Sequence, residues 1–199
     1  MPTYRHGLPS PFAHIDNSSM DQASAKAPFY VVSMGKFSAL FISTMGLYQL
    51  YWFYKHWQLL GAAQERNTLP FLRAIFDIFF ITFLCKEIAE EEKKQGQNYR
   101  WNPQAVALGF IAINIISFII RNAVIEKAIG QSWLMLLLPL FFGNYYYLYK
   151  IQLVANRVCH DPFGHANSTI TPINHAWVIF GMLSWSVNLY LLVSGQISL

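Results

Sequence analysis

Four long stretches without a charged residue restrict the fold of this chain more than any other feature. No Asp, Glu, Lys or Arg lies between Lys36 and Lys55, between Arg100 and Arg121, between Lys127 and Lys150, or after Asp161. An α-helix needs about 20 apolar residues to cross a hydrocarbon layer of about 30 Å, and each stretch approaches or exceeds that length. The charge pattern therefore predicts an all-α, polytopic membrane helix bundle.

Composition and charge narrow the classes of partner. Charged residues make up 12% of the chain, against about 25% in ordinary soluble domains. The net charge of +4 would suit nucleic acid, but the basic residues stand singly beside apolar runs and form no patch. Isolated basic residues are typical of anchors at lipid headgroups. We therefore expect membrane lipids as partners and no nucleic acid, and we expect Cys85 and Cys159 to be free thiols.

The chain divides into two parts. Residues 1–28 are polar and lack the apolar core of a signal peptide, so we expect a disordered tail there. Residues 29–199 are expected to form a single transmembrane domain. About five transmembrane helices are predicted, at residues 34–57, 71–88, 104–121, 132–149 and 176–193.

Prolines and charges mark the ends of these predicted spans. Pro70 and Pro103 open the second and third spans, since proline is tolerated in the first turn of a helix. Pro139 and Gly143 lie inside the fourth span and predict a kink. Residues 86–94 carry Glu and Lys at helical spacings, so the second helix is expected to continue out of the membrane into solvent.

An aromatic motif occurs twice. Residues 51–55 read Tyr-Trp-Phe-Tyr-Lys and residues 146–150 read Tyr-Tyr-Leu-Tyr-Lys, and each run is followed by a polar link and a span opened by proline. An odd number of predicted crossings separates the copies, so we expect an inverted two-helix repeat around a central helix, as in secondary transporters. The alternative is that an aromatic-rich chain yields such matches at its membrane interfaces without any duplication.

The first two predicted spans carry a resemblance to a known group of proteins. The residues concerned are 29–33 (Phe-Tyr-Val-Val-Ser), Lys36-Phe37, Gly46-Leu47-Tyr48, 51–55, Pro70-Phe71 and 73–76 (Arg-Ala-Ile-Phe). With their Gly-x-Tyr-x-x-Tyr-Trp-x-Tyr-Lys motif, they resemble small polytopic inner-membrane proteins of unassigned function from Gram-negative bacteria. The resemblance implies a bacterial inner membrane and supplies no reaction.

The basic residues predict an orientation. Nine Lys and Arg residues lie on the side of the N-terminus and five lie on the other side of the predicted spans, which predicts a cytoplasmic N-terminus by the positive-inside rule.

Asp77 is the most informative single residue, because a carboxylate near the middle of a membrane helix costs about 2.5 to 3.5 kcal/mol by insertion scales. Two interpretations stay open. Asp77 can pair with Arg73 one turn earlier, or with Arg121 from the third span, and serve only to hold helices together. It can also face a cavity as a proton or cation site.

The two aromatic motifs supply the rest of a candidate ligand site, because tyrosine rings stack on ligands and lysines attract phosphate or carboxylate. The candidate ligand-binding residues are Tyr48, Tyr51, Tyr54, Lys55, Arg73, Asp77, Arg121, Tyr146, Tyr149 and Lys150. The same tyrosines also suit an ordinary interface belt that binds no ligand.

Other chemistry is weakly indicated. His160 and His165 flank Asp161, but zinc sites need three or four protein ligands and no third clear one is present. Zinc-protease, phosphate-loop and serine-hydrolase motifs are missing from the chain. We therefore expect no metal, no cofactor and no enzymatic activity.

Two functional hypotheses follow. The first is a transporter-like membrane protein that binds or moves a small molecule or lipid at the interface of two pseudo-symmetric halves. The second is a noncatalytic accessory or scaffold subunit that binds other membrane proteins or a second copy of itself. The small size of the chain and the lack of a complete catalytic site favour the second.

Overall fold

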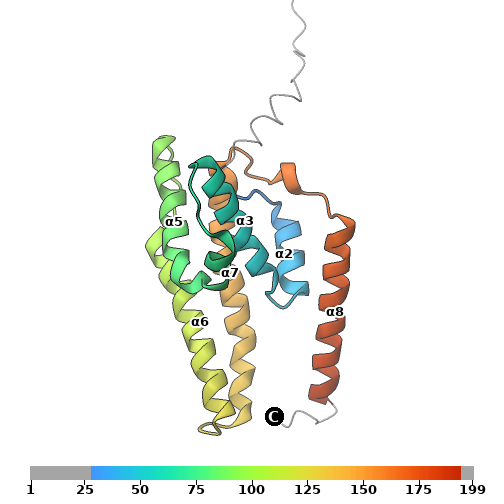
Figure 1. The fold of residues 1–199 in the computed structure, drawn as a ribbon. Helices are drawn as coiled ribbons and strands as arrows, with labels where there is room; N and C mark the ends of the chain where they lie inside the picture. Colours follow the sequence, from blue (N-terminus) through green and yellow to red (C-terminus); the bar gives the residue numbers. More distant parts are fainter. Residues whose placement is uncertain (1–27, 194–199) are drawn as a thin grey trace, which may run out of the picture.

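The computed structural model describes residues 28–193, which form a helical bundle (Figure 1). The helices are α2 (Met34–Ser43), α3 (Tyr48–Ala63), α4 (Pro70–Ile75), α5 (Asp77–Lys94), α6 (Pro103–Ile125), η1 (Gln131–Leu136), α7 (Leu137–Val158), η2 (His165–Asn167) and α8 (Pro172–Val193). The described residues contain no strand, which confirms the all-α class. Except for Pro28, the tail expected over residues 1–28 lies outside the described residues.

Helix α6 meets the requirements for a membrane span by length and composition, and it is the one helix among the described residues that does so. It begins where the third span was predicted and continues past Arg121 to Ile125. Asn102 caps its N-terminus, because its Oδ1 accepts from the Ala105 N–H at 3.0 Å. Pro103 occupies the first helical position, as expected.

The first predicted span, residues 34–57, is wrong as a continuous helix. The chain turns back between α2 and α3, where Met45 (φ 54°) and Gly46 (φ 87°) adopt left-handed conformations. The Gly46 N–H donates to the Phe41 carbonyl at 2.9 Å and the Met45 N–H to the Ile42 carbonyl at 3.2 Å. These bonds close a Schellman motif, in which Met45 takes the left-handed position that glycine usually occupies. The result is a helical hairpin whose first limb has 10 residues, about 15 Å.

The second predicted span is also interrupted. Helix α4 ends after six residues at Phe76, whose φ of −100° and ψ of 37° lie outside the helical region. Helix α5 starts at Asp77 and runs unbroken to Lys94, so the charged segment is helical as predicted. Gly96 then stops it with a φ of 66°.

Helices α6 and α7 pack closely because glycines lie between them. A Cβ atom added to Gly109 would lie 2.3 Å from the Tyr147 ring, and one added to Gly143 would lie 2.6 Å from Ile113. Pro139 falls in the first turn of α7, where it removes no helix hydrogen bond. The predicted kink is therefore replaced by the start of a helix, which then runs beyond the predicted end of the fourth span.

The two helices that carry the aromatic motif run in the same direction. Gln49 near the start of α3 bonds to Asn144 near the start of α7, and Trp52 further along α3 bonds to Gln152 further along α7. The prediction of an inverted repeat is therefore wrong. The physical reason is the α2–α3 hairpin, which returns the chain to the end of the bundle from which it came.

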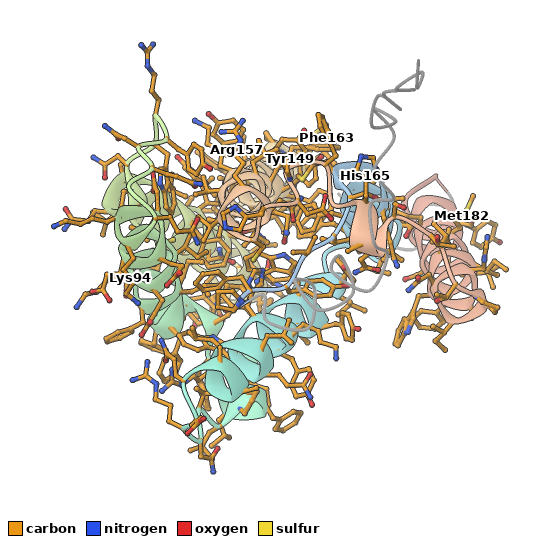
Figure 2. The ribbon with its side chains drawn as sticks, turned by 90° about the horizontal axis from the view of Figure 1, so that it is seen from above. Lys94, Tyr149, Arg157, Phe163, His165 and Met182 are labelled. Carbon is orange, nitrogen blue, oxygen red and sulfur yellow. The ribbon has the colours of Figure 1, made fainter. Side chains whose placement is uncertain are left out.

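Helix α8 packs against the end of α2. A Cβ atom on Gly181 would lie 1.8 Å from the Ser43 carbonyl oxygen, so only glycine lets the two backbones touch. The Trp185 Nε1 donates to the Ile42 carbonyl at 2.9 Å and caps α2. Seen from above, α8 with Met182 lies at the opposite edge of the molecule from α5 with Lys94 (Figure 2).

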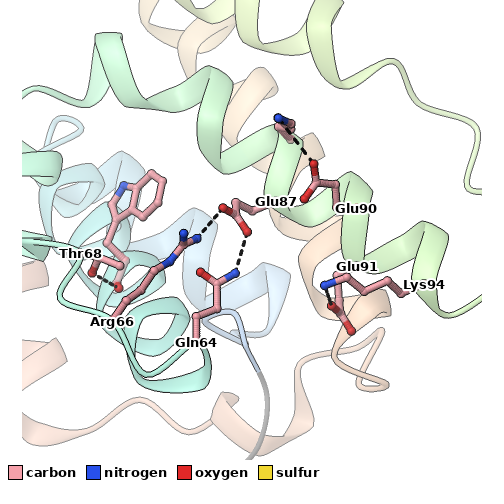
Figure 3. Close-up of polar contacts among 9 residues, drawn as sticks. Gln64, Arg66, Thr68, Glu87, Glu90, Glu91 and Lys94 are labelled. Carbon is pink, nitrogen blue, oxygen red and sulfur yellow. Dashed lines mark hydrogen bonds and ion pairs between the residues drawn. The ribbon is translucent and has the colours of Figure 1, made fainter.

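Polar contacts tie the α3–α4 loop to α5 (Figure 3). Arg66 and Gln64 both donate to the Glu87 carboxylate, at 2.8 and 2.7 Å. The Thr68 hydroxyl donates to the Trp57 carbonyl at 2.7 Å. These bonds fold the loop back onto α3 and attach it to the middle of α5.

The core is built around an extended segment, residues 29–33, which packs against α3, α7 and the α7–α8 loop. Asn156 on α7 pairs with both backbone groups of Val32, donating to its carbonyl at 2.9 Å and accepting from its N–H at 3.2 Å. Gln152 donates to the Tyr30 carbonyl at 2.9 Å. Because buried backbone groups need partners, these two amides let the extended segment lie in the interior.

The outer surface of α4, α5, α6 and α8 is strongly apolar. Its exposed large side chains include Phe71, Ile75, Phe76, Phe79 and Phe83 on α4 and α5, Leu108, Ile115, Ile116, Phe118, Ile119 and Ile125 on α6, and Trp177, Ile179, Phe180, Met182, Leu183, Val187 and Tyr190 on α8. Soluble monomers rarely expose a continuous apolar surface of this extent.

Candidate functional site

Four polar side chains from four helices form a hydrogen-bonded chain inside the bundle. The Gln49 amide nitrogen donates to the Asp77 carboxylate. The Gln49 Oε1 accepts from Asn144 Nδ2 at 2.8 Å, and the Asn144 Oδ1 accepts from Asn114 Nδ2 at 3.1 Å. We call these four residues the polar chain. It links α5, α3, α7 and α6 in that order.

Breaks in the helices set the position of the polar chain. Asp77 is the first residue of α5, directly after the interruption at Phe76. Gln49 is the second residue of α3, directly after the hairpin turn. Asn114 is the central residue of α6, the helix that can span a membrane. The polar chain therefore ends at the midpoint of that helix.

Within residues 28–193, the Asp77 carboxylate has no basic partner. The ion pairs among the described residues join Arg66 to Glu87, Lys86 to Glu90 and Lys94 to Glu91. The pairing of Asp77 with Arg73 or Arg121 that the spacing suggested is therefore not formed among the described residues.

Arg73 is occupied elsewhere. Its guanidinium lies over the Trp57 ring at 4.3 Å and over the Phe80 ring at 5.2 Å. The helix break at Phe76 separates Arg73 from Asp77, so the four-residue spacing no longer places them on one helix face. Arg121 is exposed near the end of α6.

The two motif lysines fold back onto their own helices. Lys55 Nζ lies 5.9 Å from the centre of the Tyr51 ring, and Lys150 Nζ lies 4.9 Å from that of Tyr146. Lys55 also donates to Gln58 at 2.9 Å. Among the described residues, no hydrogen bond or ring contact joins one motif to the other. A shared ligand site between them stays a prediction.

The other candidate tyrosines belong to the packing of the bundle. Tyr48 is buried, with its hydroxyl 3.3 Å from that of Tyr30. Tyr54 and Tyr149 are half-buried against the core, and Tyr149 packs on the Tyr145 ring at 5.6 Å.

Gln49 and Asn144 were missed by sequence reasoning, although each lies in one of the charge-free stretches. Asn114 can be recognised in the sequence as a polar residue within the third predicted span, residues 104–121. Amide side chains in such stretches are a usable signal, since an unpaired polar group in an apolar layer is costly and needs a partner. The sequence does not say which amides meet, because that depends on the helix breaks.

The loop with the two candidate metal-binding histidines has a structural explanation. The Asp161 carboxylate accepts from the His165 N–H at 2.9 Å and from the Ala166 N–H at 2.8 Å. Its oxygens thus hold the turn that leads into η2. Within residues 28–193, no group of three potential metal ligands is found.

Comparison of the chain with protein-family models, with curated proteins and with solved structures gives no match.

Proposed function

We propose that the protein lies in a lipid bilayer, with α6, α7 and α8 crossing it. The apolar outer surface and the length of α6 support this proposal. Helix α2 has 10 residues, so the α2–α3 hairpin reaches about halfway through a layer of about 30 Å and returns. Three crossings replace the five predicted from the sequence.

The distribution of basic residues supports one orientation. Arg121 and Lys127 lie near the turn between α6 and α7. The remaining described Lys and Arg residues are Lys36, Lys55, Arg66, Arg73, Lys86, Lys93, Lys94, Arg100, Lys150 and Arg157, on α2 to α5, in the α5–α6 loop or in the second half of α7. By the positive-inside rule the end of the bundle with the α5–α6 loop faces the cytoplasm.

Within this bilayer we assign the protein the role of a small proton-coupled transporter, with Asp77 as the group that takes up and releases the proton. The observation that carries the proposal is the polar chain, which joins a carboxyl group without a basic partner to the midpoint of α6. Ionisable groups at membrane depth are rare and typically mark ion or proton pathways.

The polar chain suits a proton better than a metal cation. The Gln49 oxygen accepts from Asn144, so the Gln49 amide nitrogen, which is a donor, faces Asp77. A cation site would need several oxygens directed at one point. A carboxyl group that faces hydrogen-bond donors can instead alternate between its protonated and ionised forms.

A lateral cavity beside the same hairpin supplies room for cargo. It has a volume of about 660 Å³ and lies between α2, α7 and α8, within the range of small-molecule sites. The cavity is lined by the apolar side chains of Ile42, Phe142, Met182 and Trp185 and by small hydroxyl side chains such as Ser38. Gln49 follows the hairpin turn and Ile42 precedes it, so the hairpin links the polar chain to the cavity. The lining favours an apolar or amphipathic small molecule.

Reconstitution into liposomes that contain a pH-sensitive dye tests the proposal. An imposed pH gradient should relax faster with the wild-type protein than in protein-free liposomes. Asp77→Asn should remove that difference while the protein stays folded, because asparagine can still accept from Gln49. Asp161→Asn, outside the helices, serves as the matched control and should keep the flux.

The accessory role is the second candidate, favoured by α8. That helix packs mainly on the end of α2 and leaves a face with Ile179, Leu183 and Val187 open. Such a face can receive a helix of another membrane protein. Equal proton flux in wild type and Asp77→Asn, with lower folded yield in the variant, would favour this role over transport.

A further inference from the structure

A second groove lies on the outside of the bundle, between α5 and α6. Its volume is about 630 Å³. The floor is formed by Ala89 and the fully buried Ala107, whose small side chains leave the space between the helices open. One end is lined by Phe83 and Leu108, which are 57% and 61% exposed.

The opposite end of this groove is charged. This end is lined by three side chains from successive turns of α5, those of Lys86, Glu90 and Lys93. Lys86 pairs with Glu90 at 3.6 Å, but both side chains are exposed, so the pair is weak. Among the described residues the Lys93 ammonium group has neither an ion pair nor a hydrogen bond.

A smaller polar cavity of about 420 Å³ continues from the charged end and shares Ala89 and Lys93 with the groove. Tyr99 and Trp101 line it, and the Trp101 Nε1 donates to the buried Glu92 at 2.8 Å. Aromatic side chains of this kind gather at the boundary between lipid tails and headgroups. Polarity thus rises steadily along the groove, from Phe83 to the α5–α6 loop.

We propose that this groove binds a single phospholipid, with an acyl chain along Phe83, Ala107 and Leu108 and the phosphate at Lys86 and Lys93. The apolar end would lie at the depth of the lipid tails and the basic end at the headgroup level on the cytoplasmic side. Basic pockets between membrane helices on that side recognise lipid phosphates. The proposal needs the bilayer placement given above but does not depend on proton uptake by Asp77.

Native mass spectrometry tests the proposal. The full chain is delipidated in detergent and then exposed to phosphatidylglycerol, phosphatidylethanolamine and diacylglycerol, which lacks phosphate. We expect retention of one phospholipid and no diacylglycerol. Lys86→Gln and Lys93→Gln should each reduce retention roughly fivefold, the effect of one basic residue at a lipid surface. Lys94→Gln, the neighbouring lysine outside the groove, should leave retention unchanged.

Two further variants separate headgroup from tail recognition. Ala89→Leu should fill the floor and block retention without a change in charge, and Glu90→Gln should increase retention of phosphatidylglycerol. Equal retention of diacylglycerol, or unchanged retention in the Lys86→Gln, Lys93→Gln double variant, would overturn the proposal. Full competition by inorganic phosphate would overturn it in favour of a site for free anions. Asp77→Asn should retain lipid as the wild type does.

Discussion

Asn156 satisfies both backbone groups of Val32, 124 residues earlier in the chain, as a neighbouring β-strand would. The side chain of Asn156 and the whole of Val32 are completely buried. This one side chain of α7 therefore pairs the backbone of the extended segment at its buried centre.

Asn156→Leu should therefore destabilise the protein by about 2 to 6 kcal/mol, because two buried backbone groups lose their partners at about 1 to 3 kcal/mol each. Thermal unfolding in detergent measures the change. Asn122→Leu on the exposed side of α6 is the control and should stay within about 0.5 kcal/mol of wild type. Equal effects of the two substitutions would show that the segment is not docked on α7.

The contact of Gly181 with Ser43 gives a prediction about α8. Gly181→Val should lower the free energy of unfolding by roughly 2 kcal/mol or more, because the added side chain collides with the α2 backbone. Gly35→Ala is the matched control, since a Cβ there meets nothing within 4 Å. It should be neutral or stabilising by up to about 1 kcal/mol.

The hairpin can be tested by labelling introduced cysteines from one side of the membrane with an impermeant maleimide. Gln58→Cys and Phe163→Cys should react from the same side and Glu126→Cys from the opposite side. Five crossings would instead place Gln58 with Glu126. That second pattern would contradict the half-length hairpin.

Cys159 reports on the same docked segment by its reactivity. Burial raises the pKa of the Cys159 thiol to about 12. Because the pKa is raised, the thiol is protonated at neutral pH. At pH 8 its alkylation should be on the order of a thousandfold slower than that of an exposed thiol, rising about tenfold per pH unit without a plateau. Peptide mass spectrometry after timed labelling measures both rates, with Gln58→Cys as the exposed reference.

The sequence predicted the parts of the fold that depend on length and charge. Helix α6 was found because 20 residues between Arg100 and Arg121 carry no charge. The hairpin was missed because the charge-free stretch from Lys36 to Lys55 is nearly long enough for a span, and a single turn at Met45 and Gly46 divides it. A non-glycine residue such as Met45 in a left-handed conformation is uncommon, so the pattern of apolar residues gave no sign of it.

The candidate site was predicted only in part, for a related reason. Asp77 was recognised from its own chemistry, since a carboxylate in an apolar segment is conspicuous wherever the helix ends fall. Arg73 was one of the two partners considered for it, on the basis of helical spacing, and that possibility depended on a continuous helix. The break at Phe76 removed the spacing and let Gln49 of another helix take the place of the arginine.

Infrared spectra of the protein in lipid bilayers, recorded over a range of pH for wild type and Asp77→Asn, test most directly whether Asp77 takes up and releases the proton. If Asp77 is the proton site, a carboxylic acid carbonyl band should appear and disappear with pH in the wild type. That band should be missing in Asp77→Asn. A wild-type spectrum without any titrating band that depends on Asp77 would contradict its role as the proton site.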